Sequence, residues 1–370
     1  MKIDQTEIIN IIKLLIYKEN SKLLKKIDFD DDNVFLEPLL FTYFNCKNNH
    51  NIPNEILHEI MQGYFVKRKE IKICSTYNSN EFVYVPQIGY FKCGDDNFIE
   101  SISIIKNTKI ELLKYPIKLL ETIFKNPKGE FIRKEDIVIN KSLIEKNINA
   151  LTNAFNYIKE NSPKQFELIE LCCKKVLVFK TNPENTNSFA TINAHGIAFL
   201  NVYQDDYDEV FFVDDIAHQT GHIILTTFFH DRKSIFKIDE EQILGDFLSK
   251  KDNRSIYVLI HAFYTYYATL ICLDDCLKNN VFKESQEKEA IGRIGFYLKK
   301  CAKDFNNFDA ITTHFKGIDK VLTSTGIEIY SMIKDKYQEI YFKWNSKTKD
   351  FDYSNQTYNF AFKNFKERNK

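Results

Sequence analysis

Two histidines one helical turn apart are the residues of this chain best suited to chemistry. The segment Asp214-Asp-Ile-Ala-His218-Gln-Thr-Gly-His222 places His218 and His222 at positions i and i+4, so on a helix both imidazoles can reach one metal ion. Asp214 lies one turn earlier on the same stripe, and we expect it to accept the second ring N–H of a ligating histidine. The spacing also fits two ordinary histidines on an amphipathic helix, so the metal hypothesis requires a third ligand.

The residue that follows His218 argues against zinc peptidase chemistry. Zinc peptidases with an H-E-x-x-H motif use the glutamate as general base for the metal-bound water. Gln219 occupies that position, and an amide cannot take up the proton. The motif therefore indicates either an inactive peptidase or a reaction that needs no base there. A metal centre that activates dioxygen is such a case.

His261 is the best candidate for a third metal ligand. It lies in the apolar segment Arg254-Ser-Ile-Tyr-Val-Leu-Ile-His261-Ala-Phe, which we expect to be a helix, and a neutral imidazole without a partner is costly there. A core histidine bonded to a neighbouring hydroxyl or backbone group is the alternative. Arg254 lies two turns before His261 on the same predicted face, and a guanidinium binds carboxylates in a bidentate manner. We therefore predict a carboxylate-binding site beside the metal.

The hydrophobic pattern predicts the elements that position these residues. We expect helices over residues 2–27, 53–67, 108–124 and 141–175, with a break near Pro163, and a strand pair at 71–77 and 82–86. Further strands at 175–180 and 197–202 precede a helix over 209–229, capped by residues 205–208. The predicted fold class is α+β and mainly helical. In the predicted fold, a small antiparallel sheet precedes a metal-binding helix. The sheet and this helix together form a zincin-like strand–helix unit within a helix-rich domain.

The chain length predicts two domains, or one large domain with elaborations, because 370 residues exceed the usual size of about 150 residues for one domain. We assign residues 1–165, with the strand pair near 71–93, to an N-terminal, mostly helical region that recognises substrate. Residues 166–345 form the predicted metal-binding catalytic domain. Residues 346–370 are rich in lysine and asparagine but carry aromatic side chains, so we expect an arm packed on the surface.

Composition excludes several classes of protein. Hydrophobic residues make up 44% of the chain, which rules out wholesale disorder. The net charge is zero, so the chain lacks the overall excess of basic residues that broad nucleic-acid binding requires. No apolar run is long enough to predict a membrane span. The 8 cysteines form no C-x-x-C pair and lie mostly in apolar runs, so we expect reduced thiols and a cytoplasmic location. Cys272 and Cys276 lie one turn apart and are interpreted as small apolar helix residues rather than metal ligands.

The segments 196–200, 215–222 and 254–263 together resemble the HEXXH-motif peptide-modifying oxygenases. These are 2-oxoglutarate-dependent peptide β-hydroxylases found with ribosomal peptide natural products. The resemblance extends over roughly residues 175–275. It implies Fe(II) held by two helix histidines and a distal histidine, which here are His218, His222 and His261. It also implies hydroxylation of side-chain β-carbons on a precursor peptide.

Arg254 matches the arginine of the distal motif in that family, and we predict in addition that it binds the cosubstrate carboxylate. The chain departs from the family pattern at Gln219, which replaces glutamate, and at Ser255 and Val258, which replace proline and glycine. The first hypothesis is therefore an oxygenase that uses Fe(II), 2-oxoglutarate and O2 on a precursor peptide. The alternatives are a zinc hydrolase in which a carboxylate such as Glu240 replaces the base, and a non-catalytic peptide-binding or partner-binding protein on a metalloenzyme fold.

Overall fold

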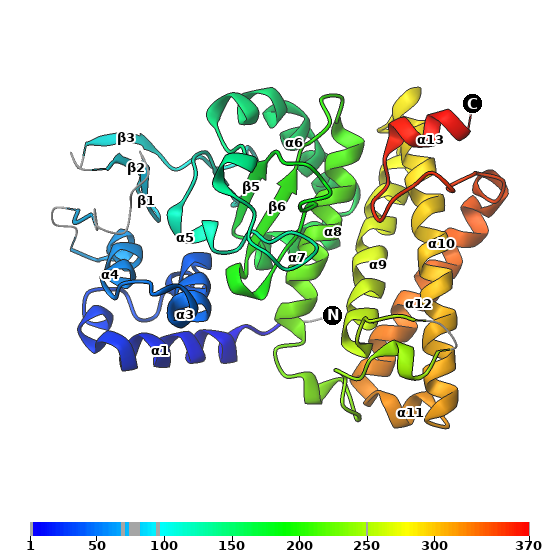
Figure 1. Cartoon of the computed structure of the whole chain (residues 1–370), viewed down its shortest axis with the longest axis horizontal. Coiled ribbons are helices and arrows are strands. Elements are labelled where there is room, and N and C mark those ends of the chain that lie inside the picture. Colours follow the sequence, from blue (N-terminus) through cyan, green and yellow to red (C-terminus); the bar gives the residue numbers. More distant parts are fainter. Residues whose placement is uncertain (1–2, 68–70, 74–81, 94–96, 249–250, 370) are drawn as a thin grey trace. The chain divides into compact units, whose positions relative to one another are not determined.

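The structure, a computed structural model, describes residues 3–67, 71–73, 82–93, 97–248 and 251–369. It is mainly helical and carries two small sheets, so the α+β class with a helical majority is confirmed (Figure 1). The chain forms two compact units. We call residues 2–152 and 170–207 the sheet unit, and residues 153–169 and 208–370 the helical unit. The sequence placed a boundary near residue 165, whereas the contacts group residues 170–207 with the N-terminal region.

The N-terminal part of the sheet unit is helical because its apolar residues recur at helical spacing. In the first helix Ile9, Ile12, Ile16 and Leu23 are buried, on one face of the expected segment 2–27. The expected helix over 53–67 is shorter in the structure. The four helices are α1 (Thr6–Leu24), α2 (Asp32–Phe35), α3 (Pro38–His50) and α4 (Glu55–Met61).

An antiparallel sheet follows these helices. It consists of β1 (Phe82–Val85), β2 (Gly89–Lys92) and β3 (Phe98–Ser101), in that spatial order. The predicted strand over 82–86 is confirmed by β1. The other predicted strand, over 71–77, lies mostly outside the described residues, and its described residues 71–73 are not in a strand.

The second sheet differs from the prediction in two ways. It contains β4 (Glu111–Leu113), β5 (Lys175–Phe179) and β6 (Ile197–Asn201), and both pairings are parallel rather than antiparallel. The predicted helix over 108–124 is wrong, because β4 pairs with β5 and Pro116 disfavours helical backbone before it. Only a short helix, α5 (Lys118–Glu121), remains there.

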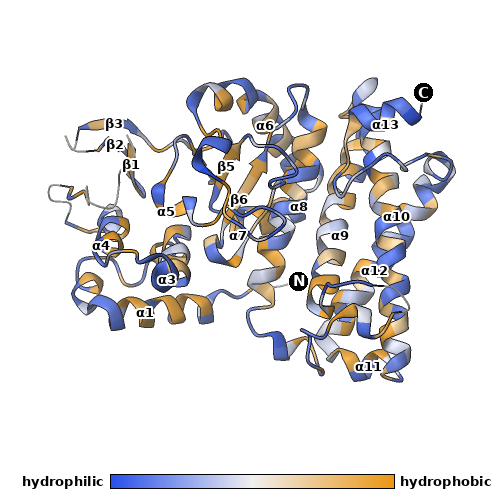
Figure 2. Cartoon of the chain, viewed as in Figure 1, coloured by the Kyte–Doolittle hydropathy of each residue, from blue (hydrophilic) through white to orange (hydrophobic). Residues whose placement is uncertain are grey.

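The parallel sheet explains why residues 170–207 belong to the sheet unit. Its crossover from β4 to β5 contains α6 (Lys141–Asn161) and α7 (Pro163–Cys172), which confirm the predicted break near Pro163. All residues of β5 and β6 are buried, and Figure 2 shows both strands as hydrophobic. Continuous apolar runs of this kind are typical of buried parallel strands.

Long helices build the helical unit. The predicted helix over 209–229 is confirmed by α8, which begins after Asp208, whose carboxylate accepts the Val210 N–H at 2.9 Å. Phe263 of α9 stacks on Phe305 of α10 at 4.6 Å between ring centroids, in the core of this unit. The helices are α8 (Glu209–Phe228), α9 (Ile256–Lys278), α10 (Ser285–His314), α11 (Ile318–Val321), α12 (Ser324–Thr348) and α13 (Phe362–Arg368).

Helix α9 is long and apolar enough, by length and composition, to cross a membrane, and it is the one such helix in the described part of the chain. In the structure, however, 72% of that apolar window is buried within the protein. Helix α9 contacts α8, α10 and α12, and these contacts require apolar residues on most of its faces.

The C-terminal residues pack against α10. Tyr353 donates a hydrogen bond from its hydroxyl to the carbonyl of Gly292 at 2.8 Å, and Phe365 of α13 is completely buried. Gly292 allows this contact, because a Cβ atom there would lie 2.9 Å from the ring of Phe365. The residues after α12 therefore pack against α10, whereas the expected arm was to begin at residue 346, inside α12.

A glycine sets the close approach of α8 to α9, which lie side by side in Figure 1. A Cβ atom at Gly221 would lie 3.3 Å from the Cα atom of Thr265 and 3.4 Å from the Cβ atom of Ala268. Larger side chains at this position would push the two helices apart. Gly221 precedes His222, so the spacing of the helices controls the position of that imidazole relative to α9.

We expect Gly221→Val to lower the free energy of unfolding by about 2 kcal/mol, because its methyl groups overlap α9. Intrinsic helix propensity favours valine slightly over glycine, so a loss of stability would come from packing. Urea unfolding measures the change. The exposed α10 residue Asn306 gives the control Asn306→Val, which should change the free energy by less than about 0.5 kcal/mol. An unaltered stability for Gly221→Val would show that the helix contact is not limiting.

Candidate metal centre

The structure brings His222 and His261 together. Their Nδ1 atoms lie 2.8 Å apart, and their rings stack with centroids 4.9 Å apart. His222 comes from α8 and His261 from α9, 39 residues later in the sequence. The predicted convergence of these two imidazoles is therefore present in the structure.

His218 completes a group of three imidazoles in one place. It lies one turn before His222 on α8, with 5.1 Å between the ring centroids. Its Nδ1 atom is buried and has no hydrogen-bond partner among the described residues. A buried polar nitrogen without a partner is costly, so this atom is suited to receive a ligand or an ion.

Aromatic side chains enclose His218. Tyr297 of α10 and Tyr266 of α9 lie 5.8 Å and 6.3 Å from its ring, measured between centroids. Both tyrosines are buried, with only 7% of the Tyr297 surface and 3% of the Tyr266 surface accessible to solvent. Tyr297 was not predicted from the sequence to be part of the site. No signal in the local sequence could have identified it, because α10 lies about 80 residues beyond the motif.

The two close imidazoles fit the ligand spacing of a transition metal. Two nitrogens that bind one ion at about 2.1 Å, at right angles, lie about 3 Å apart. The 2.8 Å between the Nδ1 atoms of His222 and His261 agrees with that spacing. As the side chains stand, the described residues contain no group of three or more His, Cys, Asp or Glu residues already arranged to hold a metal ion. His218 would have to turn toward the pair to become the third ligand.

Burial keeps all three imidazoles neutral, which is the state that binds metal. Desolvation lowers the pKa of His222 to about 4. Desolvation, followed by the neighbouring histidines and basic side chains, holds the pKa values of His218 and His261 well below their usual range. Near neutral pH the three imidazoles therefore carry no positive charge, and at the close contact one Nδ1 atom donates a hydrogen bond that the other accepts.

Asp214 does not take the predicted role beside a ligating histidine. Its carboxylate accepts hydrogen bonds from Arg293 at 2.6 Å and from the hydroxyl of Tyr297 at 2.8 Å, and both donors come from α10. Thr226, rather than Asp214, contacts the second ring nitrogen of a candidate ligand, because its hydroxyl lies 3.2 Å from the Nε2 atom of His261. Thr226 is four residues after His222 on the same stripe of α8, so the helical spacing could have identified it.

Gln219 is buried, and its side-chain amide donates a hydrogen bond to the Oδ1 atom of Asp215 at 3.0 Å. The amide is thereby fixed to its own helix, one turn back. An amide in this arrangement supplies no general base. The structural position of Gln219 agrees with the sequence argument against peptidase chemistry at this residue.

Arg254 is not on the helix face that carries His261. Helix α9 begins at Ile256 with Ser255 as its N-cap, so Arg254 precedes the helix. Its guanidinium binds the carboxylate of Asp304 through two hydrogen bonds, of 2.7 Å and 3.0 Å, and that of Asp252 at 2.8 Å. Two carboxylates already surround this one cation, so its predicted role as the anchor of a cosubstrate carboxylate would require release of Asp304.

Arg232 is a second arginine near the centre. Its guanidinium lies 3.9 Å from the ring centroid of Tyr257, and the Tyr257 ring in turn lies 5.3 Å from that of His261. Arg232 also pairs with Glu240 at 3.3 Å and with Glu241. Glu240, the carboxylate considered as a replacement base, is therefore held by a cation.

The pH dependence of stability tests the burial of the imidazole pair. The folded state binds fewer protons than the unfolded state between the usual pKa of 6.5 and the folded value of about 4 for His222. The buried, neutral His222 should therefore contribute its full share to the free energy of unfolding above about pH 6.5. This contribution should fall as the pH is lowered toward about 4. Urea unfolding of chelator-treated protein at several pH values measures how steeply the free energy of unfolding changes with pH. His222→Asn should flatten this dependence, and His230→Asn, at an exposed residue after α8, should keep it. Equal slopes for both variants would contradict the proposed environment.

Comparisons with known proteins add no assignment to the site. No protein-family model matches this chain, and a search of curated proteins finds no match. The functional interpretation therefore depends on the geometry and the chemistry of the residues themselves.

Proposed function

We propose that the helical unit is an oxygenase dependent on Fe(II) and 2-oxoglutarate, and that it hydroxylates a side-chain β-carbon of a ribosomally made precursor peptide. His218, His222 and His261 would hold the iron. The observation that carries this proposal is the 2.8 Å approach of the His222 and His261 Nδ1 atoms, next to the unpartnered Nδ1 atom of His218. Bound iron and cosubstrate would supply oxidation of an aliphatic C–H bond by dioxygen, with succinate and carbon dioxide as coproducts.

The residues around the imidazoles favour an oxygenase over a zinc hydrolase. A hydrolase needs a carboxylate that can take a proton from water. Gln219 lacks that function, and Glu240 is paired with Arg232. An oxygenase needs instead ligands and exclusion of water, and the buried rings of Tyr266 and Tyr297 provide an enclosed wall. We also propose that β6 followed by α8 corresponds to a zincin-like strand–helix unit.

Lys300 is a better candidate than Arg254 for binding the cosubstrate carboxylate. No carboxylate forms an ion pair with Lys300 in the part of the chain that the structure describes. Its ammonium group lies 5.5 Å from the ring centroid of Tyr266, which also packs on His218. Burial lowers the pKa of Lys300 to about 8, so the group is still mostly protonated at neutral pH. A carboxylate of the cosubstrate would give this half-buried cation the direct ion-pair partner that none of the described residues provides.

The proposal also includes a precursor peptide as partner and a cytoplasmic location. The described cysteines, seven in number, are free thiols, and six of them are buried. Reduced buried thiols suit a reducing compartment, in which a ribosomally made peptide would be modified before export.

Anaerobic addition of Fe(II) and 2-oxoglutarate should produce a visible charge-transfer absorption band if the three histidines hold iron. His222→Ala should abolish the band and the bound iron, because His222 is the imidazole that lies next to both His218 and His261. His230→Ala is the matched control and should keep both. Absence of the band in the unaltered protein would count against the oxygenase. Unchanged metal content in His218→Ala would favour a non-catalytic binding protein.

The same titration distinguishes the two candidate cations. Lys300→Met should raise the concentration of 2-oxoglutarate needed by about tenfold or more, because a charged hydrogen bond is lost, while iron remains bound. Arg254→Ala should leave this concentration unaltered but lower the free energy of unfolding by about 2 kcal/mol, because Asp304 would remain buried without its partner. The opposite pattern would return the cosubstrate role to Arg254.

A further inference from the structure

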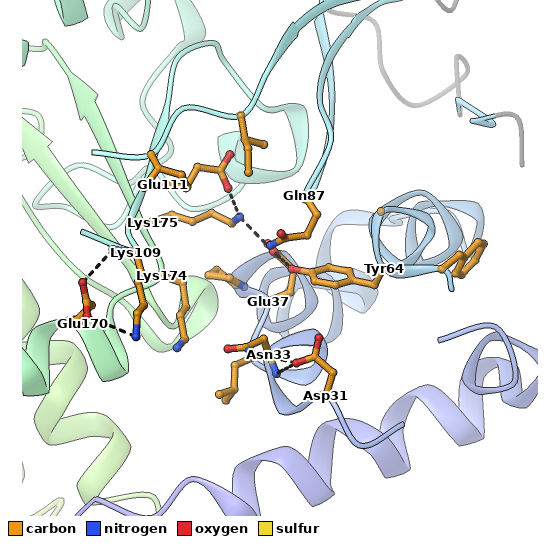
Figure 3. A pocket seen from close by; sticks show the side chains of 16 residues that line it. Asp31, Asn33, Glu37, Tyr64, Gln87, Lys109, Glu111, Glu170, Lys174 and Lys175 are labelled. Carbon is orange, nitrogen blue, oxygen red and sulfur yellow. Dashed lines mark hydrogen bonds and ion pairs between the residues drawn. The ribbon is translucent and has the colours of Figure 1, made fainter. Parts of the chain in front are cut away.

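The sheet unit contains a pocket that the metal centre does not involve. Its volume is about 420 Å³, within the range of small-molecule sites. Residues from α3, from the segment after α4, from β4 and from the start of β5 line it (Figure 3). Charged and polar side chains from several segments make up most of the lining, and apolar side chains make up the rest. The apolar side chains are those of Leu36, Pro38, Phe65, Ile102 and Ile104.

A buried lysine lies between two buried carboxylates in the lining of this pocket. The ammonium group of Lys175 lies 2.7 Å from the Oε2 atom of Glu111 and 3.1 Å from the Oε2 atom of Glu37. The three side chains are almost inaccessible, at 3%, 4% and 1% for Lys175, Glu111 and Glu37. One positive charge therefore faces two negative charges in the interior of this unit.

Two tyrosines add neutral hydrogen bonds to the same carboxylates. Tyr84 donates to the Oε2 atom of Glu111 at 2.8 Å, and Tyr64 donates to the Oε2 atom of Glu37 at 2.6 Å. Burial, followed by the nearby carboxylates, raises the pKa of both tyrosines well above the usual value, so they remain neutral donors. These contacts do not supply the missing positive charge.

One oxygen of this cluster has no partner. The Oε1 atom of Glu111 is buried and accepts no hydrogen bond from any residue that the structure describes. Figure 3 shows the ammonium groups of Lys109 and Lys174 pointing away from Glu111, and Lys109 pairs with Glu170 at 3.8 Å. Rotation about the soft terminal torsion of glutamate can turn either oxygen toward the pocket.

We propose that this pocket binds a primary alkylammonium group, with Glu111 as its acceptor. Such a group brings one positive charge and hydrogen-bond donors, which match the excess carboxylate charge and the unpartnered oxygen. Its methylene chain would contact the apolar lining. A divalent metal ion fits less well, because two carboxylates and one lysine leave an excess of only one negative charge, which a monocation neutralises and a divalent ion exceeds. The inference concerns the sheet unit and does not depend on the oxygenase proposal.

Calorimetric titration of the full chain tests the proposal with N-acetyl-lysine amide and with the near-isosteric N-acetyl-norleucine amide, which lacks the ammonium group. The lysine derivative should bind at least about tenfold more tightly. Butylamine serves as a third ligand. If it binds as tightly as the lysine derivative, the pocket recognises free amines; if it binds more weakly, the pocket recognises a lysine side chain in a peptide. Equal binding of the lysine and norleucine derivatives, or no binding at about 10 mM, would overturn the proposal.

Variants of two similar glutamates identify the acceptor. Glu111→Gln keeps the shape of the side chain but removes its charge, and should weaken binding of the lysine derivative by about tenfold or more. Glu100 is the matched control, because it also contacts a lysine and a tyrosine, at 2.7 Å from Lys114 and 2.5 Å from Tyr115, but does not line the pocket. Glu100→Gln should bind like the unaltered protein.

Unaltered binding by a folded Glu111→Gln variant would refute the role of Glu111. Circular dichroism establishes whether each variant is folded. If Glu111→Gln does not fold, the comparison of lysine and norleucine derivatives on the unaltered protein still decides whether the pocket selects an ammonium group. Calorimetric titration with potassium chloride is the remaining control. Potassium ions that bound as tightly as the lysine derivative would also overturn the assignment to an alkylammonium ligand.

Discussion

The close contact between α8 and α9 is the constraint on which the candidate metal centre depends. Gly221 has no side chain to separate the two helices, and the next residue, His222, therefore lies within hydrogen-bond distance of His261. Neither imidazole would be useful for metal binding if the helices packed at a larger distance. A single small residue thus links the stability of the helix pair to the chemistry that it supports.

Both units place a cation between two carboxylates. In the helical unit, Arg293 lies between Asp214 and Glu289. In the same unit, Arg254 lies between Asp252 and Asp304. In the sheet unit, Lys175 lies between Glu37 and Glu111. The Lys175 cluster differs because it lines a pocket and contains a buried carboxylate oxygen without a partner among the described residues, so a ligand of opposite charge can lower its free energy.

The sequence was most informative where local spacing decides the structure. The helix that carries His218 and His222, the strands at 175–179 and 197–201, and the break before Pro163 all follow from periodicity and from proline geometry. The apolar surroundings of His261 identified it as a partner, although only the packing of α9 on α8 gives its distance from His222. Local reasoning failed over residues 108–124, where pairing with a distant strand outweighed helical spacing.

Roles that depend on partners from distant helices could not be predicted. Asp214 has the right spacing from His218, but α10 supplies two better donors for its carboxylate. Arg254 was placed on a helix face, yet the helix begins after it, because the hydroxyl of Ser255 caps the chain at that point. Neither α10 nor its charges can be positioned from the local sequence alone, since the partners that α10 supplies lie between 50 and 83 residues away.

The arm after α12 has a consequence for the order in which the protein is made. Lys300 donates a hydrogen bond to the carbonyl of Tyr358 at 3.0 Å, and Arg293 lies 5.0 Å from the ring centroid of Phe360. Two basic side chains of α10 are thus held by residues that follow α12 in the chain. A nascent chain can pack α8 against α9 before residues 351–369 are synthesised, but these contacts to Lys300 and Arg293 form only after them.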